Sequence, residues 1–168
     1  MKDQKPTTRT RSRPRQNRQP GHLGNVLVPV EFSAESKQAL QYATELGRSI
    51  SLIHVVPPIT FRADYGYGPV LRHVPDKAGL RRGQTKLNCW ADKCLTPGRR
   101  GECLVRSGIP FTEIAEAARM AKSDLIILGV RDHLHCDNST LGGTPEKVLR
   151  HAPCPVLVVH RHNGKRAF

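Results

Sequence analysis

The sequence predicts an α/β domain in which a five-stranded parallel sheet carries helices on both faces. Five short apolar runs recur along the chain, at residues 25–30, 50–56, 102–106, 124–129 and 155–160. Most of them lack the polar alternation of a strand with one solvated face, which is typical of strands covered by helices on both sides. Helical patterns separate the runs near both ends of the chain, and this alternation favours a parallel sheet.

Three helices are expected between the strands. The first is capped by Ser33, whose hydroxyl can accept a free backbone N–H, and it ends at Gly47. The second begins at Pro110, because proline suits a first helical turn, and the third begins within 142–145 and ends before Pro153. Apolar residues at helical spacing form the buried stripes of the first two helices: Ala39, Leu40, Ala43 and Leu46, then Phe111, Ile114, Ala118 and Ala121.

The middle of the chain, residues 57–101, lacks a regular pattern. It is rich in proline and glycine turns, with room for a helix over Lys86–Lys93. We interpret it as a divergent insertion that is either a functional lid or partly disordered. The remainder is expected to comprise a disordered basic tail (1–24), one domain (25–161) and a short C-terminal tail (162–168).

The net charge of +13 is concentrated outside the predicted core. Residues 1–24 carry seven Lys or Arg against one acid (+6), and residues 57–102 carry nine against four (+5), so the rest adds only +2. An arginine-rich tail can bind RNA, DNA or another polyanion without any fold, or it can simply keep the chain soluble. The stretch 8–18 has no aromatic residue for base stacking, so sequence-specific recognition is not indicated.

The sequence predicts neither membrane insertion nor export. No apolar stretch approaches the roughly 18 residues of a membrane span, and the N-terminus lacks the apolar run of a secretion signal. A cytoplasmic protein with free thiols is therefore expected, without membrane contact.

The segment 129–145 joins a buried strand to a helix and predicts an anion site. Gly129 lets a ligand approach the end of the strand. The helix entrance at Gly142, Gly143 and Thr144 offers unpaired N–H groups and the positive end of a helix dipole. Phosphate suits such a site; the alternative is that the glycines only permit tight turns.

Catalysis and metal binding are not predicted. The chain has no lysine-containing phosphate loop, nucleophile elbow or HExxH motif, so we do not expect an enzyme. Asp132 or His133 could act as a base, but each is better explained as a solvated loop residue. The His and Cys residues at 133–136, and the pair Cys89 and Cys94, lack the tight, doubled spacing of a metal site. Three further residues are interpreted as core residues: His54, Cys103 and Cys154.

Four motifs resemble the universal stress protein family, over residues 25–56 and 102–161. The run Val-Pro-Val-Glu-Phe-Ser at 28–33 resembles the family's V-P-x-D-F-S opening, and residues 52–55 resemble its second strand. Residues 124–129 (DLIILG) and 148–159 (VLRHAPCPVLVV) are similar to its fourth strand and to its closing helix and strand. The resemblance implies a Rossmann-like sheet of order 3-2-1-4-5, as in the adenine nucleotide alpha hydrolases.

The resemblance also implies an adenine-nucleotide site for ATP or AMP, with Mg²⁺, at the ends of the first and fourth strands. Val30 and Glu31 end the first strand, with Glu31 at the position of the family's ribose-contacting Asp, and Val55 matches the adenine-packing position. The family's phosphate motif is G-x2-G-x9-G-[ST]. Gly129 and Gly142 match its first and third glycines, while Asp132 replaces the second glycine and Gly143 the Ser or Thr, with Thr144 adjacent.

These departures leave two functional hypotheses open. One is a non-catalytic stress-response or signalling accessory with a weakened ATP or AMP site. The other is a nucleotide-free dimeric interaction module whose basic tail binds nucleic acid or another polyanion. In either case a homodimer is expected through the last strand, Pro155–His160, because its exposed edge can pair with a second copy and relatives commonly do so.

Overall fold

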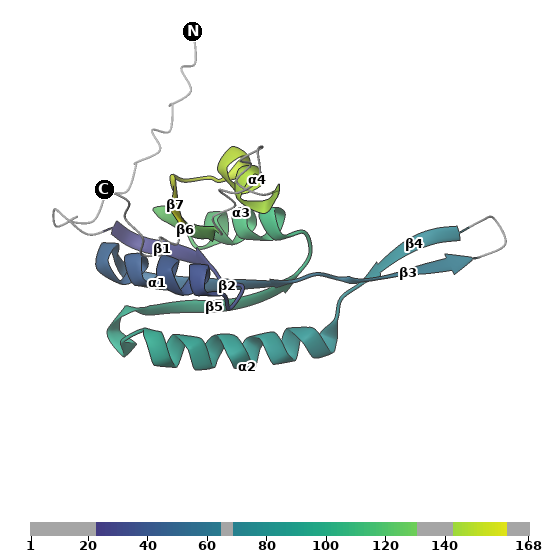
Figure 1. The fold of residues 1–168 in the computed structure, drawn as a ribbon, viewed down its shortest axis with the longest axis horizontal. Helices are drawn as coiled ribbons and strands as arrows, with labels where there is room; N and C mark the ends of the chain where they lie inside the picture. The colour runs from purple at the N-terminus through teal and green to yellow at the C-terminus, as the bar shows by residue number, and fades with distance from the viewer. Residues whose placement is uncertain (1–22, 65–68, 131–142, 161–168) are drawn as a thin grey trace, which may run out of the picture.

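The computed structural model describes residues 23–64, 69–130 and 143–160. Its main sheet has five parallel strands in the order β5-β2-β1-β6-β7 (Figure 1). Their bounds are β1 Leu23–Pro29, β2 Gly47–Val56, β5 Arg100–Ser107, β6 Leu125–Val130 and β7 Val156–His160. Counted among these five strands alone, the order is 3-2-1-4-5, which confirms the predicted fold class.

Two layers of helices cover the sheet. Helices α1 (Ala34–Leu46) and α2 (Lys77–Cys94) pack on one face, and α3 (Pro110–Met120) and α4 (Gly143–His151) pack on the other. For α1, α3 and α4, each expected boundary lies within a residue or two of the observed one. Ser33 caps α1 as predicted, because its Oγ accepts the Ser36 N–H at 3.2 Å.

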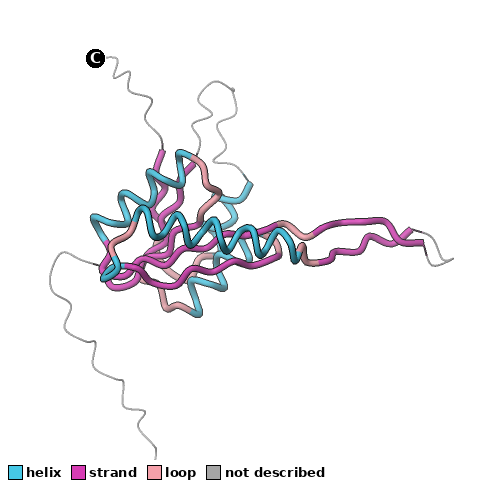
Figure 2. The backbone as a smooth tube through the Cα atoms, turned by 90° about the horizontal axis from the view of Figure 1, so that it is seen from below, coloured by secondary structure: helices cyan, strands magenta, loops and turns pink. Residues whose placement is uncertain are grey.

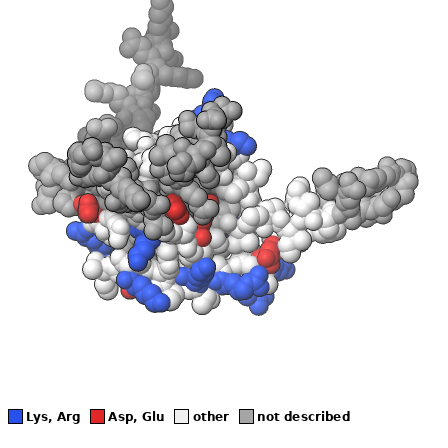
Figure 3. Space-filling view, viewed as in Figure 1, with Lys and Arg blue, Asp and Glu red and all other residues white. Residues whose placement is uncertain are grey.

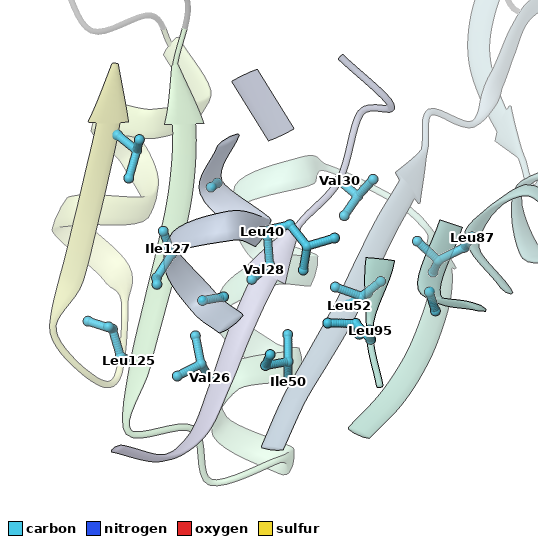
Figure 4. Close-up of a cluster of buried hydrophobic side chains, with 14 residues drawn as sticks. Val26, Val28, Val30, Leu40, Ile50, Leu52, Leu87, Leu95, Leu125 and Ile127 are labelled. Atoms are coloured by element: carbon cyan, nitrogen blue, oxygen red, sulfur yellow. The ribbon is translucent and has the colours of Figure 1, made fainter. Parts of the chain in front are cut away.

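A separate apolar cluster fills each side of the sheet. Figure 4 shows the cluster under α1 and α2, where alternate residues of the strands face Leu40 and Leu87. On the opposite side, Leu27, Ile53 and Ile126 face the α3 and α4 residues Ile114 and Val148. Because successive strand residues point to opposite faces, both clusters draw on the same strands, which explains their unbroken apolar sequence.

Residues 57–101 contain a hairpin and a long helix. Strands β3 (Ile59–Asp64) and β4 (Pro69–Val74) form an antiparallel ribbon that projects away from the sheet (Figures 1 and 2). The chain then forms α2, a short 3-10 turn η1 (Pro97–Arg99) and β5. The sequence analysis predicted neither strand of this ribbon.

Helix α2 begins nine residues before the expected Lys86. Asp76 caps it, since its Oδ1 accepts the Gly79 N–H at 2.8 Å. Gly83 weakened the helical pattern in the sequence, yet a Cβ there would lie 3.0 Å from His54 and 3.2 Å from Val105. Close packing of α2 on β2 and β5 therefore explains a glycine that helix propensity alone disfavours.

Among the described residues, no helix is long and apolar enough to cross a membrane. Within the same residues all four cysteines are free: Cys89, Cys94, Cys103 and Cys154.

Candidate nucleotide site

The carboxyl ends of three neighbouring strands form one edge of the sheet. Strand β1 lies between β2 and β6, and its chain leaves through α1 on one face while β6 is reached through α3 on the other. Such a reversal of connection is where open α/β sheets bind ligands. The structure therefore places a switch point at the ends of β1 and β6, where the sequence predicted it.

Strand register brings several of the predicted site residues to the same level. Strand β1 pairs with β2 at an offset of 24, as in Pro29 with Ile53, and with β6 at an offset of 99, as in Leu27 with Ile126. The first offset sets Glu31 level with Val55. Val30 directly follows the end of β1, and Gly129 lies one residue before the end of β6. Four candidate residues thus end three adjacent strands.

Val30 is held firmly at the end of β1. Its side chain is only 2% exposed, and its N–H donates to the Ile53 carbonyl at 2.8 Å. The Nδ1 of His54 lies 2.7 Å from the Val30 carbonyl oxygen. Because a carbonyl can only accept, this nitrogen carries the proton. His54 is therefore a hydrogen-bonded structural histidine, as the sequence suggested.

A tight turn presents Glu31 at the rim. The Glu31 N–H donates to Ser36 Oγ at 3.0 Å, and the two hydroxyls of Ser33 and Ser36 lie 3.1 Å apart. Phe32 has a φ of 60°, a left-handed conformation that disfavours side chains. These bonds fix the backbone, while the Glu31 side chain remains exposed to solvent.

Phe32 forms an aromatic wall beside Glu31 that the sequence analysis missed. Its ring lies 4.6 Å from the His54 ring and 5.6 Å, edge-on, from Trp90 on α2. The Lys86 ammonium lies 4.3 Å above the same ring. These contacts offset the cost of the left-handed backbone, roughly 1 to 2 kcal/mol. The Glu-Phe-Ser run marked the turn, but not its contact with α2.

Helix packing explains why position 129 is a glycine. A Cβ at this position would lie 2.2 Å from the Glu35 carbonyl oxygen and 2.8 Å from the Ser36 nitrogen. The first turn of α1 therefore occupies the space that a side chain at position 129 would need, and the role of Gly129 toward a ligand stays a prediction. The glycine allows α1 to pack closely on β6.

The remaining candidate residues lie on different sides of the sheet. Val55 is half-buried against the cluster under α3 and α4, on the side opposite His54. Gly143 is exposed at the start of α4, where an added Cβ would meet no atom within 4 Å, and Thr144 beside it is half-buried. Asp132 and Gly142 fall outside the described residues, as do His133, His135 and Cys136.

The other titratable groups among the described residues do not form a metal site. Within residues 23–64, 69–130 and 143–160, no group of three His, Cys, Asp or Glu could hold a metal ion. Burial, and secondarily the charge of Asp124, raises the pKa of the Cys154 thiol. Cys154 and Cys103 are both half-buried and pack against the two apolar clusters, as predicted for core cysteines.

The sequence model of the universal stress protein family matches residues 22–160. A universal stress protein of Thermus aquaticus is 30% identical over 138 residues, covering 80% of this chain and 96% of the relative. One from Methanocaldococcus jannaschii is 24% identical over 145 residues, covering 81% of both chains.

Solved structures share the fold. A universal stress protein family structure from Arabidopsis thaliana, with AMP bound, superposes with a TM-score of 0.56 at 22% identity. The match covers 83% of this chain and 93% of that one. At this identity the likeness establishes a common fold.

Proposed function

Because the chain belongs to the universal stress protein family, we propose that it is a stress-response or signalling accessory that binds ATP or AMP. The ligand lies at the carboxyl ends of β1 and β6. We assign it no catalytic residue, and we place the protein in the cytoplasm.

The exposed carboxylate of Glu31 is the observation that carries this proposal. It stands on a turn fixed by Ser36, at the switch point and level with Val55. A carboxylate at such a strand end can accept hydrogen bonds from ribose hydroxyls. The AMP bound to the Arabidopsis relative shows that this fold accommodates the proposed class of ligand.

The phosphate end of the ligand is assigned to the start of α4. Gly143 opens this helix and is exposed, so the backbone there is accessible to an anion. In the sequence, Asp132 occupies a glycine position of the family's phosphate motif. Its charge would repel a polyphosphate unless Mg²⁺ lies between them, which gives the cation its role.

Calorimetric titration with ATP and AMP, with and without Mg²⁺, tests the proposal. We expect micromolar binding that Glu31→Ala weakens about tenfold or more, since a hydrogen bond to a charged group contributes about 1.5 to 3 kcal/mol. Glu45→Ala, which removes an exposed carboxylate from the far end of α1, is the matched control and should bind normally. Equal affinities for both variants would contradict the assignment of Glu31.

Two variants in the phosphate segment complete the test. Gly142→Val should abolish binding, because a branched side chain at the helix entrance blocks the approach of the phosphate. Asp132→Gly should tighten it by removing like-charge repulsion. Absence of heat from the wild type, with binding gained in Asp132→Gly, would identify a decayed site and refute a nucleotide function for this chain.

The alternative proposal is a nucleotide-free dimeric module whose basic tail binds nucleic acid or another polyanion. The replacements at Asp132 and Gly143 favour it, because both remove features of the family's phosphate motif. Deleting residues 1–21 should then lower the salt dependence of binding to a nucleic-acid duplex. Unchanged binding after the deletion would show that the tail does not bind the duplex.

A homodimer through β7 is part of both proposals. In the part of the chain that the structure describes, strand β7 pairs with β6 alone and so ends the sheet, and residues Val156, Leu157 and Val158 are only partly buried. An unpaired apolar edge favours pairing with a second copy. Light scattering at micromolar concentration should give the mass of two chains, and a single-chain mass would count against it.

A further inference from the structure

The solvent-facing side of α2 is a basic surface with a shallow groove of about 660 Å³. We define it as the α2 basic face, formed by Arg81, Arg82, Lys86, Cys89, Trp90 and Lys93. In Figure 3, Lys and Arg side chains gather along the edge of the molecule that α2 forms in Figure 1. The family motifs do not include this surface, which adjoins the nucleotide site where Lys86 and Trp90 contact Phe32.

Helical geometry explains why the cations lie together. Gly83, Leu87 and Ala91 are buried against the sheet, so the opposite side of α2 faces water. Arg81 and Lys93 are twelve residues apart, which corresponds to about 18 Å along the helix axis. The face is therefore a cationic strip rather than a single basic point.

Most of the charge on this strip is uncompensated. Helix α2 contains five Lys or Arg (residues 77, 81, 82, 86 and 93) against one acid, Asp92, which leaves +4. Among the described residues, Arg81, Lys86 and Lys93 have no carboxylate within ion-pair distance. Arg82 lies 3.6 Å from Asp76, but its side chain is 73% exposed, so this ion pair is weak and leaves the guanidinium accessible to another anion.

We propose that the α2 basic face binds the sugar-phosphate backbone of nucleic acid. A strip of about 18 Å spans about five phosphates at 3.4 Å of rise per strand. Arginine and lysine side chains neutralise such phosphates and release their counterions, so the binding is salt-dependent and independent of sequence. This proposal assigns the binding to α2 rather than to the N-terminal tail, and the surface adjoins the nucleotide site where Lys86 and Trp90 contact Phe32.

The composition of the face distinguishes this partner from two others. A helix that lies on a membrane presents large apolar residues toward the lipid, whereas Thr85 and Cys89 stand between the cations here. Stable protein interfaces have an apolar anchor at their centre. The one large ring, Trp90, is half-buried and already packs edge-on against Phe32.

Two full-length triple variants with equal net charge test the proposal. Arg81→Gln/Arg82→Gln/Lys93→Gln neutralises the α2 basic face but keeps Lys86 over Phe32. The matched control, Arg119→Gln/Lys147→Gln/Arg150→Gln, removes three cations from α3 and α4 on the other side of the sheet. Both variants retain the basic tail and lose the same net charge on opposite faces of the sheet; in the control, Arg119 and Arg150 also lose their ion pairs with Glu116 and Glu146. Circular dichroism and thermal melting confirm that each is folded.

Fluorescence anisotropy with a labelled 20-nucleotide single strand and a 20-base-pair duplex measures the affinity. Each lost phosphate contact lowers the salt slope by about 0.7 to 0.9. The α2 variant should therefore lose about two to three units of slope and at least about tenfold in affinity near 0.1 M salt. The control should stay within about twofold of the wild type, because its charges lie on the other face.

Cys89 supplies an independent footprint, since its thiol is exposed within the groove. Saturating oligonucleotide should slow its alkylation in the wild-type chain. Equal losses of oligonucleotide affinity in both triple variants would overturn the proposal, and so would unchanged alkylation of Cys89 in the presence of oligonucleotide. Absence of oligonucleotide binding by the wild type would overturn it as well. Binding to phosphatidylserine vesicles without binding to oligonucleotides would also overturn it.

Discussion

Replacing Gly129 by alanine tests whether this glycine serves the fold or a ligand. The added Cβ would lie 2.2 Å from the carbonyl oxygen of Glu35 and 2.4 Å from its carbonyl carbon. These distances are about 1 Å or more below ordinary van der Waals contact, and both atoms belong to the backbone of α1. Neither can move by a side-chain rotation, so α1 must shift away from β6.

The expected cost is at the upper end of the range for overpacking. Inserted methyl groups typically destabilise by about 1 to 3 kcal/mol, and here rigid backbone opposes the methyl group. We expect a loss of about 3 kcal/mol in the free energy of unfolding. Gly143→Ala is the matched control, because no atom lies within 4 Å of its Cβ position. It should leave stability unchanged or raise it by up to about 1 kcal/mol.

Urea denaturation followed by circular dichroism measures both variants. With an m-value of about 2 kcal/mol/M, Gly129→Ala should lower the midpoint by about 1.5 M, and Gly143→Ala should leave it nearly unchanged. A midpoint change below about 0.3 M for Gly129→Ala, at constant m-value, would refute the packing explanation. The other interpretation, in which the glycine makes room for a ligand, would then be favoured.

Three further predictions concern other parts of the fold. Ser51→Ala should destabilise by about 1 to 3 kcal/mol in the same urea assay, because buried Ser51 Oγ accepts the Glu102 N–H at 3.2 Å and donates to Asn25 at 3.3 Å. Ser33→Ala should cost about 0.5 to 2 kcal/mol by removing the cap of α1, and a circular dichroism melt that matches the wild type would exclude this role. Burial and Asp124 raise the pKa of Cys154 above its ordinary value of 9.0, so its thiolate fraction near pH 8 is lower when folded. Its alkylation, followed by mass spectrometry, should be slower than in the urea-unfolded chain. The stability that the protonated Cys154 thiol contributes is fully present below the pKa of this thiol in the unfolded chain. It is lost as the pH rises through the higher pKa of the thiol in the folded protein.

The main sheet and three of its helices could be predicted because their signals are local. Strands β1, β2, β6 and β7 read as apolar runs since both faces are buried. Ser33 and Pro110 marked helix starts through hydrogen bonding and a preset φ within one turn. None of these predictions depended on the order of the strands in the sheet, which was taken from the family resemblance.

Helix α2 and the hairpin could not be predicted in the same way. Gly79 and Gly83 lower helix propensity within four residues of each other. An added Cβ at Gly79 would meet the capping carboxylate of Asp76, whereas the reason for Gly83 is long-range. An added Cβ at Gly83 would press on the side chains of His54 and Val105, which belong to β2 and β5. The strands β3 and β4 mix apolar and charged residues and form a sheet of their own, so neither produced the apolar pattern of a core strand.

The candidate site was predictable where it rests on a motif and unpredictable where it rests on contacts. Glu31 and Val55 were identified from the resemblance, and strand register sets them at one level. The left-handed backbone of Phe32 has no local signal, because glycine or asparagine is the usual residue at such a φ. Its justification is the packing of Trp90 and Lys86 from α2, a helix that the sequence only partly indicated.

Phe32 joins the two anion sites that we propose. It follows Glu31 at the end of β1, and its ring receives Lys86 of the α2 basic face. A ligand that displaces this ring changes the environment of both surfaces. Thermodynamic linkage then requires nucleotide to alter nucleic-acid affinity by the same factor with which nucleic acid alters nucleotide affinity. Lys86→Gln removes the cation over this ring together with one charge of the α2 basic face, whereas the variant at Arg81, Arg82 and Lys93 leaves the ring contact intact. Loss of coupling in Lys86→Gln, with coupling retained in the triple variant, would identify Phe32 as the connection.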